Sequence, residues 1–297
     1  MTTTVTAPPS DRISSPSPAP HRRRQRHYLA PIARHGMLIV ASILFFGPFV
    51  WMILTSLKTP VEATQYPPTI FPSHWQWHNY ISIFQQEPFG RFYFNSILTT
   101  TIATAGQIVT SAFAGYAFAR LRFPGRNLLF FLMLGALLVP FQVVFVPLVH
   151  LLGDFHWLNS YQGLIVPNIP SAFGAFLFRQ FFSQFPAELE DAARMDGAGL
   201  WRRFTRIIAP LSKSVVGSFG ILSFVYNWNN FFFQFVIVNS SKYMTVQLGL
   251  TIFQAQNSES QFNLLMAASS LAVVPVVIVF LIFQKQIVRG VTLQGLK

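Results

Sequence analysis

Two polar stretches stand out in a chain that is 52% hydrophobic and only 10% charged. The first, "FVYNWNNFFFQF", sets aromatic rings beside carboxamides within an apolar run. Carboxamides both donate and accept hydrogen bonds, and aromatic faces suit the CH faces of a sugar, so this pattern favours a neutral, hydroxyl-rich solute. The candidate pathway residues are Tyr226, Asn227, Trp228, Asn229, Asn230 and Gln234. The residues leave a second interpretation open, in which these side chains only join one helix to another.

The second stretch, "ELEDAARMDGAGLWRRFTRIIAP", covers residues 188–210 and gathers acids before arginines. Pro186 and the acids that follow it suit the first turn of a helix, and Gly197 suits a stop at a position with positive φ. Apolar residues then recur at helical spacing over 200–208, and Pro210 is expected to end that second helix. Two short helices joined by a tight turn could dock onto a protein or lie on a membrane surface.

Residue types suited to catalysis or metal binding are sparse. The chain has no cysteine, no Gly-x-x-x-x-Gly-Lys-Ser/Thr phosphate loop and no His-Glu-x-x-His motif. His74 and His78 have metal-ligand spacing, but no carboxylate or third histidine stands near them, and Trp75 and Trp77 are typical of an interfacial aromatic belt. We therefore predict a chain that is not an enzyme, with no catalytic residue, no metal and no cofactor of its own.

Membrane-length apolar segments must position both polar stretches. Crossing about 30 Å of hydrocarbon takes roughly 20 helical residues, and six runs of about that length occur. They are 37–57, 96–118, 128–148, 161–178, 215–238 and 264–283. We therefore predict an all-α membrane protein with six transmembrane helices. Pro140 and Pro147 predict kinks in the third span, and Pro167 and Pro170 interrupt the fourth, which must then face protein and not lipid.

The basic residues set the predicted orientation. Of the 21 lysines and arginines, 18 lie before the first span, in the second and fourth loops, and after the last span. Because basic loops stay on the cytoplasmic side, both termini and the 188–210 stretch are predicted to be cytoplasmic. The net charge of +12 then reflects this bias and attraction to membrane lipid, and no nucleic-acid-binding pattern accompanies it.

The chain divides into a tail, residues 1–36, and a membrane domain, residues 37–297. The tail is rich in Pro, Ser and Arg and has too little apolar surface for a core, so we predict a disordered cytoplasmic segment. A cleaved secretory signal is the rival interpretation. The apolar run that follows is long for a signal and lacks a small-x-small cleavage site.

Polar and small residues inside the second span have two interpretations. Ser111, Gly115 and Ala119 are spaced four apart, which lets helices approach closely in lipid, whereas the threonines of this span could also line a solute pathway. All charged residues lie outside the six spans. Their absence at membrane depth argues against proton coupling, although sodium coupling through backbone carbonyls stays open.

The 188–210 stretch resembles the EAA loop of ABC-importer permeases, in which Glu-Ala-Ala, three residues, Gly, nine residues and Ile-x-Leu-Pro form the coupling helices. The match falls on Asp191, Ala192, Ala193, Gly197, Ile207 and Pro210, and Asp196 extends it toward the carbohydrate-type branch. Asp191 replaces the motif's Glu and Ala209 replaces its Leu, and the sequence leaves open whether Glu190 or Asp191 takes the acid's role. "FARLRFPGRN" and "FQKQIVRGVTLQGLK" are also similar to maltose-type permeases, so the resemblance covers 37–297.

This resemblance implies a type I importer permease with cytoplasmic coupling helices in an EAA loop at 185–211. The chain would lie in a bacterial-type inner membrane as a multi-pass subunit and form the translocation pathway for a sugar or oligosaccharide. Its implied partners are a second permease subunit in a heterodimer, an ABC ATPase dimer that binds ATP and Mg, and an extracytoplasmic solute-binding protein. The alternative is a stand-alone six-span secondary carrier or facilitator of polar solutes.

Overall fold

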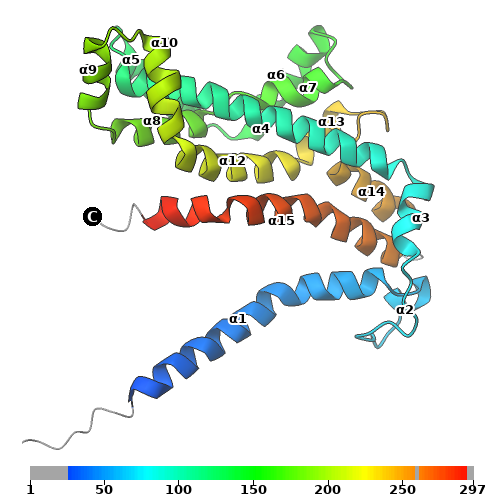
Figure 1. Cartoon of the computed structure of the whole chain (residues 1–297). Helices are drawn as coiled ribbons and strands as arrows, with labels where there is room; N and C mark the ends of the chain where they lie inside the picture. Colours follow the sequence, from blue (N-terminus) through cyan, green and yellow to red (C-terminus); the bar gives the residue numbers. More distant parts are fainter. Residues whose placement is uncertain (1–25, 258–260, 293–297) are drawn as a thin grey trace, which may run out of the picture. The chain divides into compact units, whose positions relative to one another are not determined.

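The computed structural model describes residues 26–257 and 261–292, and every regular element within them is helical. This confirms the all-α fold class. Two compact units are distinguished, one up to Val50 and one from Trp51 onward. The predicted tail over residues 1–25 lies outside the described residues, and the first helix, α1 (Arg26–Ser56), begins inside the range predicted as tail (Figure 1).

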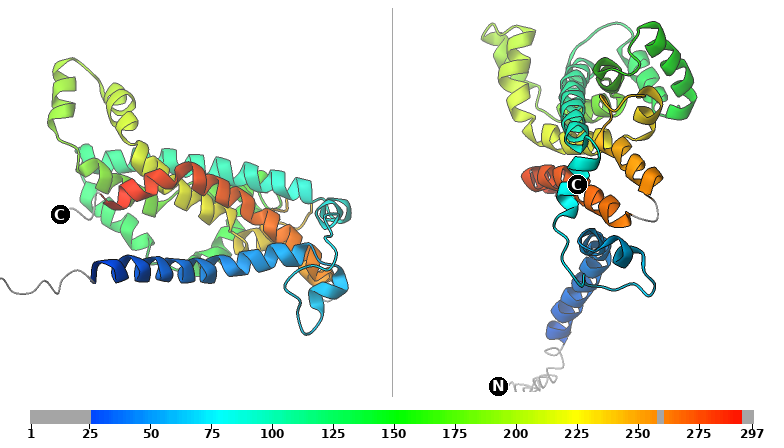
Figure 2. Two further views of the ribbon diagram at one scale, coloured as in Figure 1. Left: turned by 60° about the horizontal axis from the view of Figure 1, so that its bottom comes forward. Right: turned by 90° about the vertical axis from the view of Figure 1, so that its right-hand side faces the viewer.

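The second unit contains the remaining helices, most of them short. In chain order they are α2 (Pro60–Thr64), α3 (Asn79–Gln86), α4 (Phe89–Arg120), α5 (Arg126–Ala136), α6 (Phe141–Asp154), α7 (Tyr161–Ile165), the 3-10 turn η1 (Val166–Asn168), α8 (Ala172–Ser183), α9 (Glu188–Met195), α10 (Leu200–Arg203), the π-helical turn η2 (Phe204–Ile208), α11 (Ala209–Leu211), α12 (Lys213–Trp228), α13 (Phe232–Ile237), α14 (Val246–Asn257) and α15 (Phe262–Thr292). Within this unit α12 packs against both α4 and α15, as the ribbon shows (Figures 1 and 2).

Three helices in the described residues are long and apolar enough to cross a membrane without a break. They are the 34–56 part of α1, the whole of α4, and the 262–285 part of α15. Two bent pairs, α5 with α6 and the 200–211 segment with α12, raise the number to five if each pair is one span. The first, second and sixth predicted spans are thus continuous helices.

The third predicted span is sharply bent, and not merely kinked. The axes of α5 and α6 meet at 97° across the residues before Pro140. Pro140 has no backbone N–H to donate and restricts the residue before it, so the helix cannot continue through this point. Pro147, in contrast, lies inside α6. One of the two prolines therefore breaks the span and the other is accommodated.

The fourth and fifth predicted spans are also interrupted. The fourth divides into α7, η1 and α8 around Pro167 and Pro170, and the fifth divides into α12 and α13 at Asn229. The fourth faces protein, as predicted, because α8 packs along α4. Neighbouring side chains satisfy the broken backbone, since the Gln107 amide donates to the carbonyl of Asn168 at 2.5 Å.

Small residues allow α4 and α8 to approach closely. A Cβ placed on Gly115 would lie 2.5 Å from the Cβ of Phe178 and 2.8 Å from the backbone nitrogen of Arg179. On the facing helix, Gly174 leaves room for Ser111 and for the ring of Phe219. The small-residue face of the second span is therefore a packing surface, in agreement with the helix-packing interpretation.

Candidate functional site

The first half of the 188–210 stretch forms the helix that the sequence predicts. α9 covers Glu188–Met195, and its acids complement the positive end of the helix. Gly197 follows with φ of 74°, in the left-handed region that glycine adopts without strain. The predicted glycine stop with positive φ is confirmed. Gly199, two residues later, has φ of −66° and precedes α10.

Glu190 is the centre of a buried charge cluster at the base of α9. Only 5% of the residue is exposed. One carboxylate oxygen lies 3.3 Å from the Nε of Arg120, and the other lies 3.5 Å from Nη1 of Arg203. The Tyr116 hydroxyl donates to the second oxygen at 3.2 Å. We call Glu190, Arg120, Arg203 and Tyr116 the Glu190 cluster, and it joins α9 to α4 and α10.

Arg120 extends this cluster to α8. Its Nη2 donates to the carbonyl oxygens of Phe182 at 2.7 Å and Phe185 at 2.5 Å, which lie at and beyond the end of α8. The Phe182 carbonyl also accepts from the Phe185 backbone N–H at 3.3 Å, so the guanidinium reinforces a helix end that is already closed by its own backbone. One arginine therefore ties the loop that precedes α9 to the end of the longest span.

Asp191 has a different environment from its neighbour. Its side chain is 64% exposed and meets only Arg194, whose Nη1 lies 3.5 Å away. Ala192, Met195 and Asp196 are exposed as well, whereas Ala193 is buried. Successive helix positions point about 100° apart, so α9 turns Glu190 and Ala193 inward and leaves a free outer face.

The second half of the stretch differs from the single helix that was predicted. α10 passes into the π turn η2 over Phe204–Ile208, and α11 continues through Pro210 to Leu211. The prediction that Pro210 ends this helix was wrong by one residue. A proline ring in a regular helix clashes with the carbonyl four residues earlier, and the wider π turn immediately before α11 relieves that clash.

Aromatic stacking and burial hold this second half against α4. The Trp201 ring stacks on Phe113 with centroids 5.9 Å apart, and Phe204 and Ile208 are buried in a cluster with Tyr116 and Phe182. Ile207 is half-buried and Pro210 is exposed. The later part of the stripe that the sequence indicates for a second helix therefore packs on protein, whereas Leu200 and Trp201 at its start are largely exposed.

The aromatic and amide stretch separates into buried and exposed members. Asn227, Trp228 and Gln234 are buried. Asn227 donates to Thr104 and Gln107 of α4, each at 3.3 Å, and the Trp228 indole donates to the carbonyl of Ala272 at 3.0 Å. Gln234 pairs with the hydroxyl of Thr245. Each of these three side chains has a hydrogen-bond partner on another helix or segment inside the helix bundle. This arrangement agrees with the helix-joining interpretation.

Tyr226 and Asn229 instead face outward. Tyr226 is 62% exposed, and Asn229 is exposed at the break between α12 and α13. The side-chain oxygen Oδ1 of Asn229 accepts a hydrogen bond from the side-chain amide of Gln247 in α14 at 3.3 Å. Asn230 is half-buried, with its amide 3.4 Å from the side-chain oxygen of Asn168. Tyr226 lies three residues before Asn229 and so on the same side of the chain, and we call Tyr226, Asn229 and Gln247 the polar edge.

The sequence did not identify the cationic members of the Glu190 cluster. Arg120 and Arg203 are more than 80 residues apart, and nothing in their local pattern distinguishes them from other loop arginines. In the described part of the chain, no group of three or more His, Cys, Asp or Glu side chains could hold a metal ion.

The chain matches the family described as binding-protein-dependent transport system inner membrane component over residues 107–293. A glycerol 3-phosphate transport system permease protein, UgpE from Yersinia enterocolitica, is 34% identical over 86% of this chain and 94% of its own length. The arabinooligosaccharides permease AraQ of Bacillus subtilis is 33% identical over 90% of this chain and 95% of its own. A diacetylchitobiose permease, NgcG of Streptomyces coelicolor, is 30% identical over 87% and 86%.

A solved structure shares the fold. It is a crystal structure of a bacterial ABC transporter involved in the import of the acidic polysaccharide alginate, with a TM-score of 0.77, 21% identity, and coverage of 90% of this chain and 99% of the other. The fold, the family match and the relatives agree with the resemblance carried by the 188–210 stretch. The chain belongs to the family of inner-membrane components of binding-protein-dependent ABC transport systems, and it is a transport permease subunit and not an enzyme.

Proposed function

We propose that this permease forms part of the import pathway for a sugar or oligosaccharide and is coupled to a separate ATPase through residues 185–211. The Glu190 cluster is the observation that carries the proposal. It fastens α9 and α10 to the ends of α4 and α8, while Ala192, Met195 and Asp196 remain exposed on the outer face of α9. A segment that is fixed at its base and free at its tip can transmit a partner's movement to the membrane helices.

The mechanism is alternating access driven by a partner. ATP and Mg are bound by an ABC ATPase dimer, and its closure moves α9 and the turn at Gly197. The Glu190 cluster passes this movement to α4, so the membrane helices switch between two arrangements. Such a switch requires that the ATPase contact the two arrangements with different free energies, and attachment alone shifts nothing.

The same proposal assigns orientation and domains. The coupling segment lies at the opposite end of the second unit from α2 and α3 (Figures 1 and 2). Of the 21 basic residues, 18 lie in the two terminal segments and in the second and fourth loops, and the fourth loop contains 188–210. Because basic loops stay on the cytoplasmic side, we place that end and both termini in the cytoplasm. We also propose that residues 1–36, which include the first turns of α1, lie on the cytoplasmic side, and that 37–297 form the permease domain.

The substrate class follows from the edge formed by Tyr226, Asn229 and Gln247. It offers an aromatic face and carboxamides without a charge, which suits hydroxyl groups. Two of the relatives named above are permeases for saccharides by name, which agrees with a sugar, and the third is by name a permease for glycerol 3-phosphate. A second permease subunit in a heterodimer would close this edge into a pathway, and an extracytoplasmic binding protein would deliver the solute.

Reconstitution tests the proposal. The chain is placed in vesicles with its second permease and ATPase, and the cognate binding protein is screened by thermal shift against arabinooligosaccharides, diacetylchitobiose and glycerol 3-phosphate. We expect a sugar to stabilise the binding protein and to enter vesicles only with ATP on the ATPase side. Uptake by the permease without ATPase would favour the stand-alone carrier, and stabilisation by glycerol 3-phosphate alone would refute the sugar assignment.

A further inference from the structure

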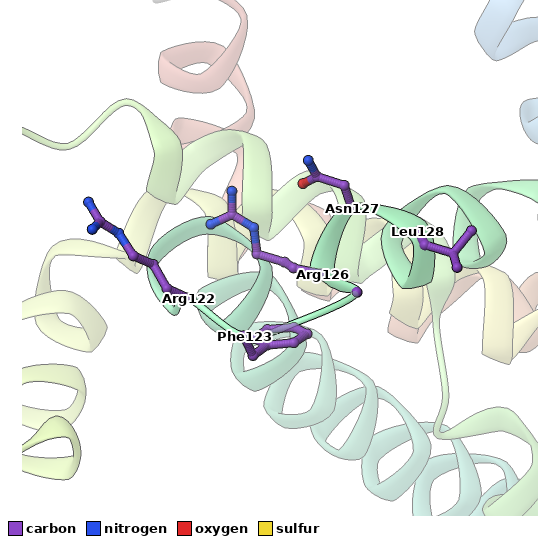
Figure 3. Close-up of a pocket in the computed structure, with 6 residues that line it drawn as sticks. Arg122, Phe123, Arg126, Asn127 and Leu128 are labelled. Carbon is purple, nitrogen blue, oxygen red and sulfur yellow. The ribbon is translucent and has the colours of Figure 1, made fainter.

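A cationic hollow lies at the turn between α4 and α5. Its volume is about 420 Å³, and its lining residues are Arg122, Phe123, Gly125, Arg126, Asn127 and Leu128. Figure 3 shows the side chains of Arg122, Arg126 and Asn127 directed to the same side of the turn. Gly125 has φ of 77° and precedes the first turn of α5, where the Arg126 N–H donates to the Phe123 carbonyl at 3.4 Å and the N–H groups that follow it point back toward the turn. Donors and positive charge therefore converge here.

The positive charge of this hollow is not neutralised within the described part of the chain. None of the ion pairs there includes Arg122, Arg126 or Arg179 of the neighbouring α8. Arg126 donates only to the Leu121 carbonyl at 3.1 Å. The Arg179 guanidinium lies 3.7 Å from the centroid of the Phe130 ring, with its Nε buried and unpartnered. Burial and then the charge of Arg126 lower the pKa of Arg179, as uncompensated cations would.

The surroundings of the hollow are apolar. Leu128 lines it, and α5 continues with exposed Leu129, Phe131 and Leu132. A phosphate bound by the arginines would thus be followed by a strip of hydrocarbon along the helix. This combination fits an amphiphile, whereas an acidic protein segment would find polar donors at one end only.

We propose that the hollow at the α4–α5 turn binds the phosphate headgroup of an anionic phospholipid, whose acyl chains lie along α5. The site requires that this end of the molecule be cytoplasmic, as the proposed orientation has it, but it does not depend on the identity of the transported solute. Arg120 belongs to the Glu190 cluster and Arg122 lines the hollow two residues later. A bound lipid would therefore hold the turn that directly follows the anchor of the coupling segment.

The test uses the purified full chain and native mass spectrometry with phosphatidylglycerol or phosphatidylcholine of the same acyl chains. We compare wild type with Arg122→Gln/Arg126→Gln, with Arg122→Lys/Arg126→Lys, and with Lys213→Gln/Lys285→Gln. The last variant removes the same charge from exposed sites outside the hollow. Size-exclusion elution checks that each variant is folded.

We expect wild type to retain phosphatidylglycerol over phosphatidylcholine, and the glutamine variant to bind it about thirty-fold more weakly, the loss expected for two arginines. The lysine variant and the Lys213/Lys285 variant should stay close to wild type. An equal loss in the Lys213/Lys285 variant would reduce the effect to net charge and overturn the site. Competition by millimolar inorganic phosphate would assign the hollow to free phosphate. If the glutamine variant kept the lipid but no longer co-purified with the ATPase in the assembled transporter, the hollow would be a protein contact and not a lipid site.

Discussion

At the scale of single residues, Glu190 and Asp191 are adjacent acids with different partners. Glu190 faces the buried Arg203, the half-buried Arg120 and a tyrosine, and Asp191 meets one arginine at the surface. Removing one member of a buried ion cluster leaves the others charged without a counter-ion, whereas exposed pairs contribute little. We therefore assign the anchoring role to Glu190 and leave Asp191 free for the partner.

The first prediction compares Glu190→Gln with Asp191→Asn. The former should destabilise the permease by about 3–5 kcal/mol, because the buried Arg203 and the half-buried Arg120 lose their counter-ion. The latter should change stability by less than about 1 kcal/mol. Thermal unfolding of the purified chain measures both, and equal melting temperatures for the two variants would contradict the anchoring role.

A second prediction concerns two glycines with the same free space and different backbones. No atom lies within 4 Å of a Cβ built on Gly197 or Gly199, but only Gly197 has positive φ. Gly197→Ala should cost about 1–2 kcal/mol at the turn and reduce ATP-driven uptake, and Gly199→Ala should leave uptake near wild type. Uptake assays in vesicles decide this, and matching losses in both variants would show that the turn geometry is not the cause.

The third prediction uses the division between exposed and buried pathway candidates. Trp228→Ala should cost about 3–5 kcal/mol and impair assembly, because the indole is 2% exposed and bonded to α15. Tyr226→Ala and Asn229→Ala should instead change uptake kinetics while the complex assembles normally. Co-purification together with uptake rates separates the two effects. Failed assembly of the exposed variants would mean that they are packing residues.

The sequence predicted the positive φ of Gly197 because glycine punctuation is a local property of the chain. It did not distinguish Glu190 from Asp191, since that difference arises from Arg120 and Arg203, which the fold brings from distant positions. The same holds for Asn227 and Asn229, two amides that are separated only by which side of α12 meets α4.

At the scale of elements, glycines on both helices let α4 and α8 pack closely. Sequence spacing indicated the small-residue face of α4 but could not identify its partner helix. It also did not predict the π turn before Pro210 or the 97° angle between α5 and α6, because hydropathy records the length of an apolar run and not its course.

The fourth prediction pairs Gly115→Ala with Gly135→Ala. An added Cβ at Gly115 meets the Phe178 Cβ and the α8 backbone, and we expect a destabilisation of about 1–3 kcal/mol from overpacking. At Gly135 in α5 the Cβ meets open space, so the gain in helix propensity should leave stability unchanged or raise it by up to about 1 kcal/mol. Melting curves of the two variants provide the comparison, and a stabilised Gly115→Ala would contradict the close packing.

At the scale of the whole molecule, the chain is a transport permease subunit whose sequence contains no phosphate loop for hydrolysing ATP. Membership of the transport family confirms the general role that the 188–210 stretch indicated. The central proposal is that a separate ATPase binds residues 185–211, and the rest of the coupling account depends on it.

Site-specific cross-linking tests that claim most directly, because the natural chain has no cysteine and each introduced thiol is unique. Met195→Cys places a thiol on the outer face of α9, where the residue is 90% exposed, and Gln85→Cys places one on α3 at the opposite end of the second unit. In the assembled transporter, Met195→Cys should cross-link to the ATPase, with a yield that changes when ATP is added, and Gln85→Cys should not. Cross-linking to the ATPase from Gln85→Cys but not from Met195→Cys would contradict the assignment of 185–211 as the coupling segment.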